Sequence, residues 1–154
     1  MKIETINIKQ ASKDDVDALC VIESACFNTP WTRIGFADFF ENECSLCLIA
    51  SIDGCVVGYV GMYIIDDVCE ITNIATLPEY RKRKVATSLM NELIDICKAR
   101  SVRRVILEVR ASNLTAISFY KKIGFYEVGI RKGYYKNPKE DAVLMDCKTD
   151  GENL

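Results

Sequence analysis

The sequence predicts a mixed α/β fold, with a central, mostly antiparallel sheet and helices on both of its faces. Short runs of β-branched and aromatic residues in the first half are joined by tight turns, which makes those strands antiparallel. A long amphipathic helix in the second half then connects two strands, which makes that pair parallel. No linker or repeat divides the 154 residues. Residues 1–147 are therefore expected to form one domain, and residues 148–154 a disordered tail.

The first half of the chain is expected to begin with one strand and two helices. Residues 2–8 predict the strand, and Ser12 is a typical N-cap for a helix that reaches about residue 25. Pro30 interrupts, and a shorter helix rich in phenylalanine follows. Three strands are expected next, over residues 46–52, 56–65 and 69–76, with turns at Asp53-Gly54 and Asp66-Asp67.

The second half is expected to begin with a crossover connection. The basic run Arg81–Lys84 precedes a helix whose apolar residues recur at helical spacing and which ends near Arg100. Because this helix links two strands, the crossover should be right-handed. The remaining elements are a strand at 103–109, a helix at 113–122, a strand at 125–130, a loop rich in Gly, Tyr, Lys and Pro, and a strand at 141–147. The predicted order is β-α-α-β-β-β-α-β-α-β-β.

Composition and charge indicate a globular protein without a membrane or nucleic-acid partner. Hydrophobic residues make up 49% and charged residues 27% of the chain, and the net charge is −2, which gives no general attraction to nucleic acid or anionic lipid. No apolar run approaches the roughly 20 residues that span a bilayer. The first ten residues lack a signal-peptide core. We therefore expect a cytoplasmic protein.

Eight cysteines and the absence of histidine limit the possible chemistry. Most of the cysteines lie among apolar neighbours, as small hydrophobic residues do. Cys44 and Cys47 form a single C-x-x-C pair, whereas a zinc site needs about four ligands. We expect reduced, mostly buried thiols and no bound metal. Acid–base chemistry would have to use carboxylates, phenols, lysines or thiols.

The segment Leu107–Phe125 brings together two groups suited to acid–base chemistry. Glu108 alternates with apolar residues on its strand, so its side chain leaves the face that they occupy. Asn113 is a typical N-cap for the next helix, and Tyr120 lies seven residues further, on the same helical face. Each residue also has a structural interpretation: Glu108 as a carboxylate paired with Arg110, Tyr120 as a core aromatic, and Asn113 as a cap alone.

The basic run after the strand at 69–76 has the features of an anion site. Free N–H groups and the positive end of the dipole at a helix start favour phosphate. The four basic side chains of Arg81–Lys84 would add positive charge. A solvated basic turn is the structural alternative.

Taken in order, these motifs resemble those of the GNAT acetyltransferase superfamily over about residues 2–147. Within it, they are similar to those of the RimI-type ribosomal-protein-alanine N-acetyltransferases. Six motifs on the expected elements are more specific than any one of them. They are Cys26-Phe27-x-x-Pro30-Trp31, Asn73-Ile74-Ala75 before Pro78-Glu79-Tyr80-Arg81, Leu107–Asn113, Phe119-Tyr120-x-x-x-Gly124-Phe125, Arg131-Lys132-x-Tyr134-Tyr135, and Asp141-Ala142.

The resemblance implies an acetyl-CoA cleft where the central parallel strands splay apart. It implies that the strand Asn73–Thr76 holds the pantetheine and polarises the acetyl carbonyl, and that the turn Arg81–Thr87 holds the pyrophosphate. Glu108 matches the family's general base and Tyr120 its general acid. The implied cofactor-binding residues are Ile74, Ala75, Thr76, Lys82, Arg83, Lys84, Val85, Ala86, Thr87 and Asn113. The implied peptide-binding residues are Phe27, Pro30, Trp31, Tyr134 and Tyr135.

The implied chemistry is direct attack of an amine on the thioester. A peptide α-amine has a pKa of about 7.7–8.0, so Glu108 need remove only a loosely held proton. A phenol near pKa ~10 is a weaker acid than a thiol near ~8.5, so Tyr120 is better described as a hydrogen-bond donor to the leaving sulfur.

One residue departs from the family's pyrophosphate motif, Q/R-x-x-G-x-G/A. Lys84 stands at the first glycine, where the absence of a Cβ lets the backbone approach phosphate. We expect acetyl-CoA binding to survive, because the backbone N–H groups and the helix dipole remain.

The predicted function is transfer of an acetyl group from acetyl-CoA to the N-terminal alanine of a small-subunit ribosomal protein. An alternative keeps the chemistry and changes the acceptor to a lysine side chain, a polyamine or another small amine. Lysine, with a pKa of about 10.4, would need a stronger base or a more desolvating pocket. A third reading is a non-catalytic acyl-CoA-binding module, favoured only by Lys84 and opposed by Glu108, Asn113 and Tyr120.

Overall fold

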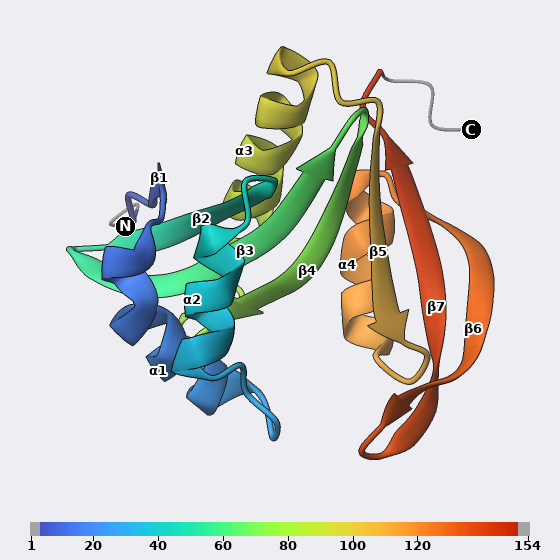
Figure 1. Cartoon of the computed structure of the whole chain (residues 1–154), viewed down its shortest axis with the longest axis horizontal. Coiled ribbons are helices and arrows are strands. Elements are labelled where there is room, and N and C mark those ends of the chain that lie inside the picture. Colours follow the sequence, from blue (N-terminus) through green and yellow to red (C-terminus); the bar gives the residue numbers. More distant parts are fainter. Residues whose placement is uncertain (1–3, 151–154) are drawn as a thin grey trace.

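The computed structural model describes residues 4–150, which form a seven-stranded sheet and four α-helices. The sheet order is β1-β2-β3-β4-β5-β7-β6, and β4 and β5 are its parallel neighbours (Figure 1). The strands are β1 (Asn7–Gln10), β2 (Ser45–Ile52), β3 (Cys55–Ile65), β4 (Val68–Thr76), β5 (Arg104–Arg110), β6 (Tyr126–Lys136) and β7 (Lys139–Lys148). The helices are α1 (Val16–Cys26), α2 (Arg33–Glu41), α3 (Val85–Ala99) and α4 (Leu114–Ile123). The predicted fold class and order of elements are confirmed.

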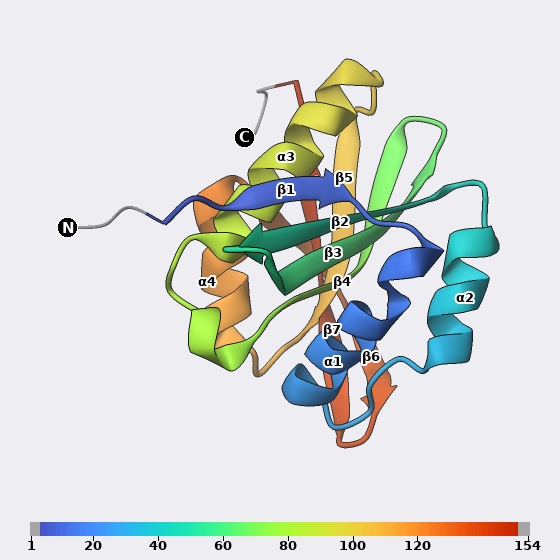
Figure 2. The ribbon, with the colours of Figure 1, turned by 90° about the vertical axis from the view of Figure 1, so that its left-hand side faces the viewer.

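The helices cover the two faces of the sheet in pairs. Helices α1 and α2 lie on one face, and α3 and α4 on the other (Figure 2). Side chains of β2 enter the two cores alternately: Leu46 and Leu48 pack on the α3 face, and Cys47 and Ile49 on the α1 face. Because both faces are covered, β2 is a nearly continuous apolar run. No helix within residues 4–150 is long and apolar enough to cross a membrane.

A predicted helix cap and a predicted hairpin turn are both present in the structure. The Ser12 hydroxyl accepts a hydrogen bond from the Asp14 N–H (3.2 Å), and the Ser12 N–H donates to the Asp15 carboxylate (2.9 Å). This reciprocal capping box begins the first helical segment. Asp53 and Gly54 adopt φ angles of 51° and 80°, which a tight two-residue hairpin turn requires.

The parallel strands β4 and β5 pair over only a short distance. Val68–Glu70 pair with Arg104–Ile106, and the two strands then diverge (Figure 1). A β-bulge bends β4 just beyond this point, since Gly61 of β3 pairs with Asn73 and the next pair skips Thr72. A Cβ on Gly61 would lie 2.9 Å from Thr72 Oγ1, so the bulge requires glycine on the facing strand. The bulge therefore opens the sheet between β4 and β5.

Two predicted boundaries near the ends of the sheet were wrong. The first strand was expected at residues 2–8 but is Asn7–Gln10, and residues 1–3 lie outside the described part. The loop expected before residue 141 is instead the end of β6 and the start of β7. Gly133 adopts a φ of 61° within a register shift of β6, so the strand absorbs the glycine as a bulge and continues.

The tail expected at residues 148–154 is ordered where it begins. Lys148 is the last residue of β7, and Thr149 is buried with its hydroxyl donating to the Val102 carbonyl. Residues 151–154 lie outside the described part of the chain.

Candidate active site

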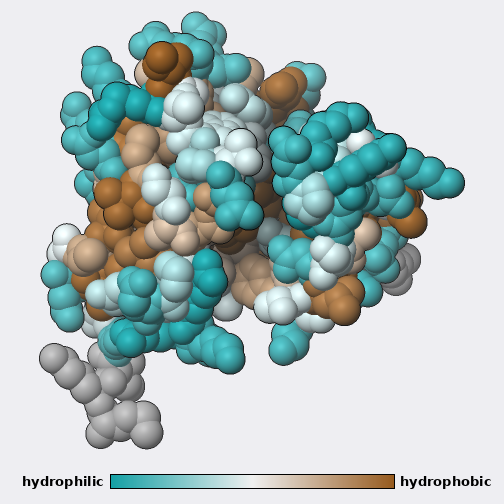
Figure 3. Space-filling model, turned by 90° about the horizontal axis from the view of Figure 1, so that it is seen from below, coloured by the Kyte–Doolittle hydropathy of each residue, from teal (hydrophilic) through white to brown (hydrophobic). Residues whose placement is uncertain are grey.

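A hollow separates the half of the molecule that contains β1–β4 from the half that contains β5–β7 (Figure 3). Apolar and pale atoms line its interior, and hydrophilic side chains form much of its rim (Figure 3). It lies where β4 and β5 no longer pair. We call the α3 and α4 face of this opening the first side, and the α1 and α2 face the second side.

On the first side, the turn before α3 leaves backbone N–H groups free. The first bond of the helix runs from the Ser88 N–H to the Lys84 carbonyl (2.9 Å), so the preceding N–H groups have no partner within the helix. Lys82 and Lys84 have φ angles of 63° and 70°. Alternating left-handed residues turn successive N–H groups toward one concave side, which binds anions. Lysine at this position costs about 1 kcal/mol relative to glycine, so Lys84 preserves the turn at a modest cost.

Two arginines of the basic run, Arg81 and Arg83, form hydrogen bonds or ion pairs with other residues of the chain. Arg81 Nε donates to the Thr76 carbonyl (3.2 Å), and the Cys26 thiol donates to the same oxygen (3.2 Å). Arg83 forms an ion pair with Glu4 (2.8 Å). Among the predicted pyrophosphate-binding residues, Lys82 and Lys84 therefore have exposed positive charges, whereas the charge of Arg83 is partly neutralised by Glu4.

Glu108 lies on the second side. Its strand neighbours Leu107 and Val109 are buried in the core under α3 and α4, so its carboxylate points to the opposite face. Glu108 Oε1 is 3.4 Å from Arg131 Nη2, whereas Oε2 is buried without a hydrogen-bond partner. An interaction with the Glu108 carboxylate raises the pKa of the Tyr134 hydroxyl. A buried oxygen that lacks a donor is costly, so this carboxylate is suited to receive an ammonium group.

Tyr120 and Asn113 come from α4, on the first side. Tyr120 is 6% exposed and packs against the rings of Phe119 and Phe125, at 5.5 Å from each. Burial, and secondarily the nearby Tyr135, raises the pKa of Tyr120, so the phenol stays protonated and is suited to donate a hydrogen bond. The Asn113 side-chain oxygen accepts from the Ala116 N–H (3.1 Å), and its amide NH₂ group remains available to donate to a ligand.

The β6–β7 hairpin holds the two adjacent tyrosines in different environments. The Arg110 guanidinium lies 4.2 Å from the Tyr135 ring centre, is paired with Glu140 (3.2 Å) and donates to the Pro138 carbonyl (2.9 Å). The suggested Glu108–Arg110 pair is thus replaced by Arg110–Glu140 and Arg131–Glu108. Tyr134 packs edge-on against Tyr135 and stays 45% exposed, so Tyr134 is the ring open to a ligand.

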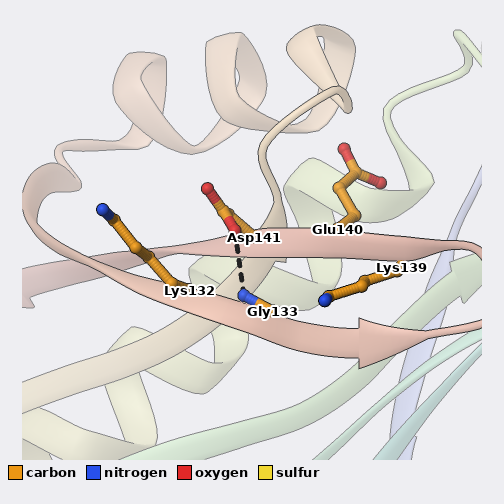
Figure 4. Close-up of a pocket in the computed structure, with 5 residues that line it drawn as sticks. All are labelled: Lys132, Gly133, Lys139, Glu140 and Asp141. Atoms are coloured by element: carbon orange, nitrogen blue, oxygen red, sulfur yellow. Dashed lines mark hydrogen bonds between the residues drawn. The ribbon is translucent and has the colours of Figure 1, made fainter.

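A shallow pocket near the turn of this hairpin is lined by Lys132, Gly133, Lys139, Glu140 and Asp141 (Figure 4). The Gly133 N–H donates to the Asp141 carboxylate (2.9 Å), as Figure 4 shows. This bond fixes the bulge that precedes Tyr134. The pocket contains none of the predicted site residues.

The loop between α1 and α2 carries the other predicted peptide-binding residues. Phe27 follows α1 and is 37% exposed. Trp31 packs on Phe36 and Phe39, with ring centres 5.3 and 5.9 Å away, and Pro30 before it is half-buried. Phe27 is therefore the open ring of this loop, and Trp31 covers the edge of the core.

Neither Glu23 nor Arg131 was predicted as a site residue, and the structure places both around this opening. Arg131 faces Glu108, and Glu23 is buried beneath the α1–α2 loop. Glu23 is buried in α1 together with the apolar residues Val16, Leu19 and Ile22. A carboxylate at a core position needs hydrogen-bond donors. A glutamate on the apolar face of a helix was therefore the sequence signal that could have identified Glu23.

None of the cysteines forms a disulfide, and no group of metal ligands forms within residues 4–150. Burial raises the pKa of Cys47 to about 12. Cys47 therefore lacks the lowered thiol pKa of a redox cysteine.

These features define a class of group-transfer enzymes: a sheet opened between parallel strands, with an anion-binding helix start on one side and a carboxylate on the other. Residues 16–125 match the model of the Acetyltransferase (GNAT) family, and the chain belongs to this family. The fold and the resemblance predicted from the sequence are confirmed, and the chain is an acetyltransferase.

Relatives of the chain are similar over nearly its whole length. A Bacillus subtilis protein named "Putative ribosomal protein bS18-alanine N-acetyltransferase" is 39% identical over 139 residues, covering 90% of this chain and 92% of that protein. The ribosomal protein bS18-alanine N-acetyltransferase of Escherichia coli K12 is 32% identical over 140 residues, covering 90% and 94%. The crystal structure of the Escherichia coli ribosomal-protein-S18-alanine N-acetyltransferase superposes with a TM-score of 0.89, covering 97% of this chain and 99% of the other.

Proposed function

We propose that this enzyme transfers the acetyl group of acetyl-CoA to the N-terminal α-amine of a protein, and that its acceptor is the N-terminal alanine of a small-subunit ribosomal protein. Two relatives described above are named for this reaction on ribosomal protein bS18. Such an acceptor places the enzyme in the cytoplasm.

The opening between β4 and β5 is the observation that carries the proposal. On the first side, the free N–H groups of the turn before α3, with Lys82 and Lys84, fit the pyrophosphate of acetyl-CoA. Backbone groups of Ile74–Thr76 border the opening and fit the amides of the pantetheine arm, as an added strand would. On the second side, Glu108 fits the amine. The remaining residues of the proposed cofactor site are Arg83, Val85, Ala86, Thr87 and Asn113.

The chain's own residues supply what the transfer needs. The buried oxygen of Glu108 takes the proton of the α-ammonium group, directly or through water. The amine nitrogen then bonds to the acyl carbon, the carbon–sulfur bond breaks with its electron pair on sulfur, and the second proton that the nitrogen loses neutralises the departing thiolate. Backbone N–H groups of β4 stabilise the carbonyl oxygen as charge develops on it. Tyr120 donates a hydrogen bond to the departing sulfur, which burial favours by keeping the phenol neutral.

Acceptor recognition combines exposed and supporting rings. Phe27 and Tyr134 are the exposed rings and would contact the first residues of the peptide. Pro30, Trp31 and Tyr135 would shape the groove from behind, since each is at least half-covered by its neighbours.

Competing acceptors in one assay test the proposal. The purified enzyme is supplied with acetyl-CoA and either a peptide with a free N-terminal alanine, the same peptide with a blocked N-terminus and an internal lysine, or a polyamine. We expect kcat/KM for the free α-amine to exceed the others by at least about a hundredfold, with mass spectrometry placing the acetyl group on the first residue. A preference for lysine or polyamine would establish the alternative acceptor class.

Calorimetry tests the donor separately. We expect acetyl-CoA to bind with a Kd below ~1 mM despite Lys84. Absence of binding at that concentration would contradict the assigned pyrophosphate turn.

A further inference from the structure

Glu23 is the charged side chain that is fully buried within residues 4–150. It lies in α1 at 0% exposure and accepts hydrogen bonds from three donors. They are the Trp31 N–H (2.8 Å, to Oε1), the Asn73 side-chain amide (2.9 Å, to Oε2) and the Tyr59 hydroxyl (2.5 Å, to Oε2). A carboxylate with three donors is satisfied in its charged form. Burial beside that charge raises the pKa of Tyr59, so its hydroxyl remains a donor.

The donors belong to the parts that border the second side of the opening. Trp31 is in the loop between α1 and α2, which carries Phe27. Asn73 follows the bulge of β4, just before the Ile74–Thr76 segment. Tyr59 anchors the carboxylate from β3 behind them. One buried carboxylate therefore joins the acceptor loop to the strand that borders the thioester site.

A second attachment holds the other end of the same loop. The Cys26 thiol donates to the Thr76 carbonyl (3.2 Å), and the Phe27 N–H donates to the Glu23 carbonyl (2.9 Å). The loop over residues 27–32 is thus fastened to β4 at its start through Cys26 and at its end through Glu23.

Stability alone does not account for a buried carboxylate at this place. Replacing buried charged networks by apolar residues of similar volume is often neutral or stabilising, whereas such networks can define one geometry. We propose that Glu23 is a positioning residue, which sets the distance between the acceptor loop and the edge of β4 and so aligns the acceptor amine with the thioester. This inference rests on the proposed function, and small displacements of a reacting group lower rates strongly.

Three variants and three measurements test the inference. Glu23→Met removes the charge and keeps a similar volume, and Tyr59→Phe removes one donor. Tyr63→Phe is the matched control, since Tyr63 lies on the same strand and packs on Phe39 (5.3 Å) outside the Glu23 contacts. The measurements are steady-state kinetics with an alanine-initiated peptide, calorimetry with acetyl-CoA, and the fluorescence of Trp31, the single tryptophan of the chain.

We expect Glu23→Met to raise the peptide KM by about ten- to a hundredfold, as loss of bonds to a charged group does. The acetyl-CoA Kd should change by less than about threefold, because the pyrophosphate turn lies on the other face. Trp31 emission should shift to longer wavelength and become more accessible to acrylamide. Tyr59→Phe should show the same pattern at about threefold, and Tyr63→Phe should match the wild type.

Equal losses for peptide and acetyl-CoA would overturn the inference, because they indicate general loosening. An unchanged peptide KM together with unchanged Trp31 emission would also overturn it. If Glu23→Met does not fold, Tyr59→Phe decides the question by the same criteria. Failure of the wild type to acetylate the peptide would instead contradict the proposed function, and Trp31 emission would still test the attachment of the loop.

Discussion

The two sides of the opening between β4 and β5 differ in what they are made of. The first side consists mainly of backbone groups, the N–H groups of the turn before α3 and the edge of β4, to which Tyr120 and Asn113 add side chains. The second side consists mainly of side chains, with Glu108, Arg131 and Tyr134 in mutual contact.

This difference predicts that the turn before α3 tolerates substitution better than the second side does. Any residue that adopts the required φ supplies the same N–H group, so Lys84 can stand at a position where the family has glycine. A carboxylate, by contrast, has no backbone substitute as a base. We therefore expect mutations on the second side to change kcat, and mutations in the turn before α3 to change acetyl-CoA binding only modestly.

The largest expected effect is at Glu108. Glu108→Gln should lower kcat by about a hundred- to ten-thousandfold, since the amide cannot accept a proton from the ammonium group. Acetyl-CoA binding by calorimetry should be unchanged, because Glu108 lies on the opposite face from the turn. Glu127→Gln is the control, as its carboxylate is half-exposed and paired with Lys121 (3.3 Å). Equal kcat for wild type and Glu108→Gln would remove Glu108 as the base.

The sequence predicted the backbone-made side more completely than the other. Periodicity and turn residues place β4, the basic turn and α3 in order. The hydrogen-bond pattern of any α-helix then leaves the N–H groups at its start without partners in the helix. What it could not predict was that Lys82 and Lys84 adopt positive φ, because lysine carries no local preference for that conformation.

Contacts between segments that are distant in the sequence were not predicted. Glu108 was identified as a candidate, but its partner Arg131 is 23 positions away on β6, and the suggested partner Arg110 turned to Glu140 instead. Glu23 reaches Asn73 across 50 positions. Such pairs depend on strand register and on the bulge in β4, which no local pattern encodes.

Tyr120 is expected to have the next largest effect. Tyr120→Phe should lower kcat by about ten- to a hundredfold, at or below the lower end of the acid–base range of about a hundred- to ten-thousandfold, because only a hydrogen bond to the leaving sulfur is lost. The raised pKa favours the neutral phenol, so ionisation of Tyr120 should not lower the rate up to about pH 10. A decline in wild-type kcat between pH 8 and 10 that disappears in Tyr120→Phe would show that the phenol titrates in that range.

Tyr134 gives a smaller test of the side-chain-made side. Tyr134→Phe removes the hydroxyl that interacts with Glu108 while keeping the exposed ring. We expect kcat/KM for the peptide to fall by about three- to tenfold, as the loss of one ordinary, solvent-accessible hydrogen bond predicts. Tyr126→Phe, on the same strand, should match the wild type. A tenfold rise in acetyl-CoA Kd in Tyr134→Phe would contradict the division between the two sides.

Lys84 should show the smallest effect, and it tests the backbone-made side directly. Lys84→Gly relieves about 1 kcal/mol of left-handed strain but adds freedom to the unfolded chain worth about 0.4–1 kcal/mol. The free energy of unfolding should therefore change by less than about 1 kcal/mol. Lys84→Ala is the matched variant, because it loses the same charge and keeps the Cβ. Calorimetry should give an acetyl-CoA Kd for Lys84→Gly within about threefold of the wild type, and a weaker one for Lys84→Ala. If both variants instead lose more than about thirtyfold, the lysine charge rather than the backbone holds the pyrophosphate, and the contrast between the two sides is wrong.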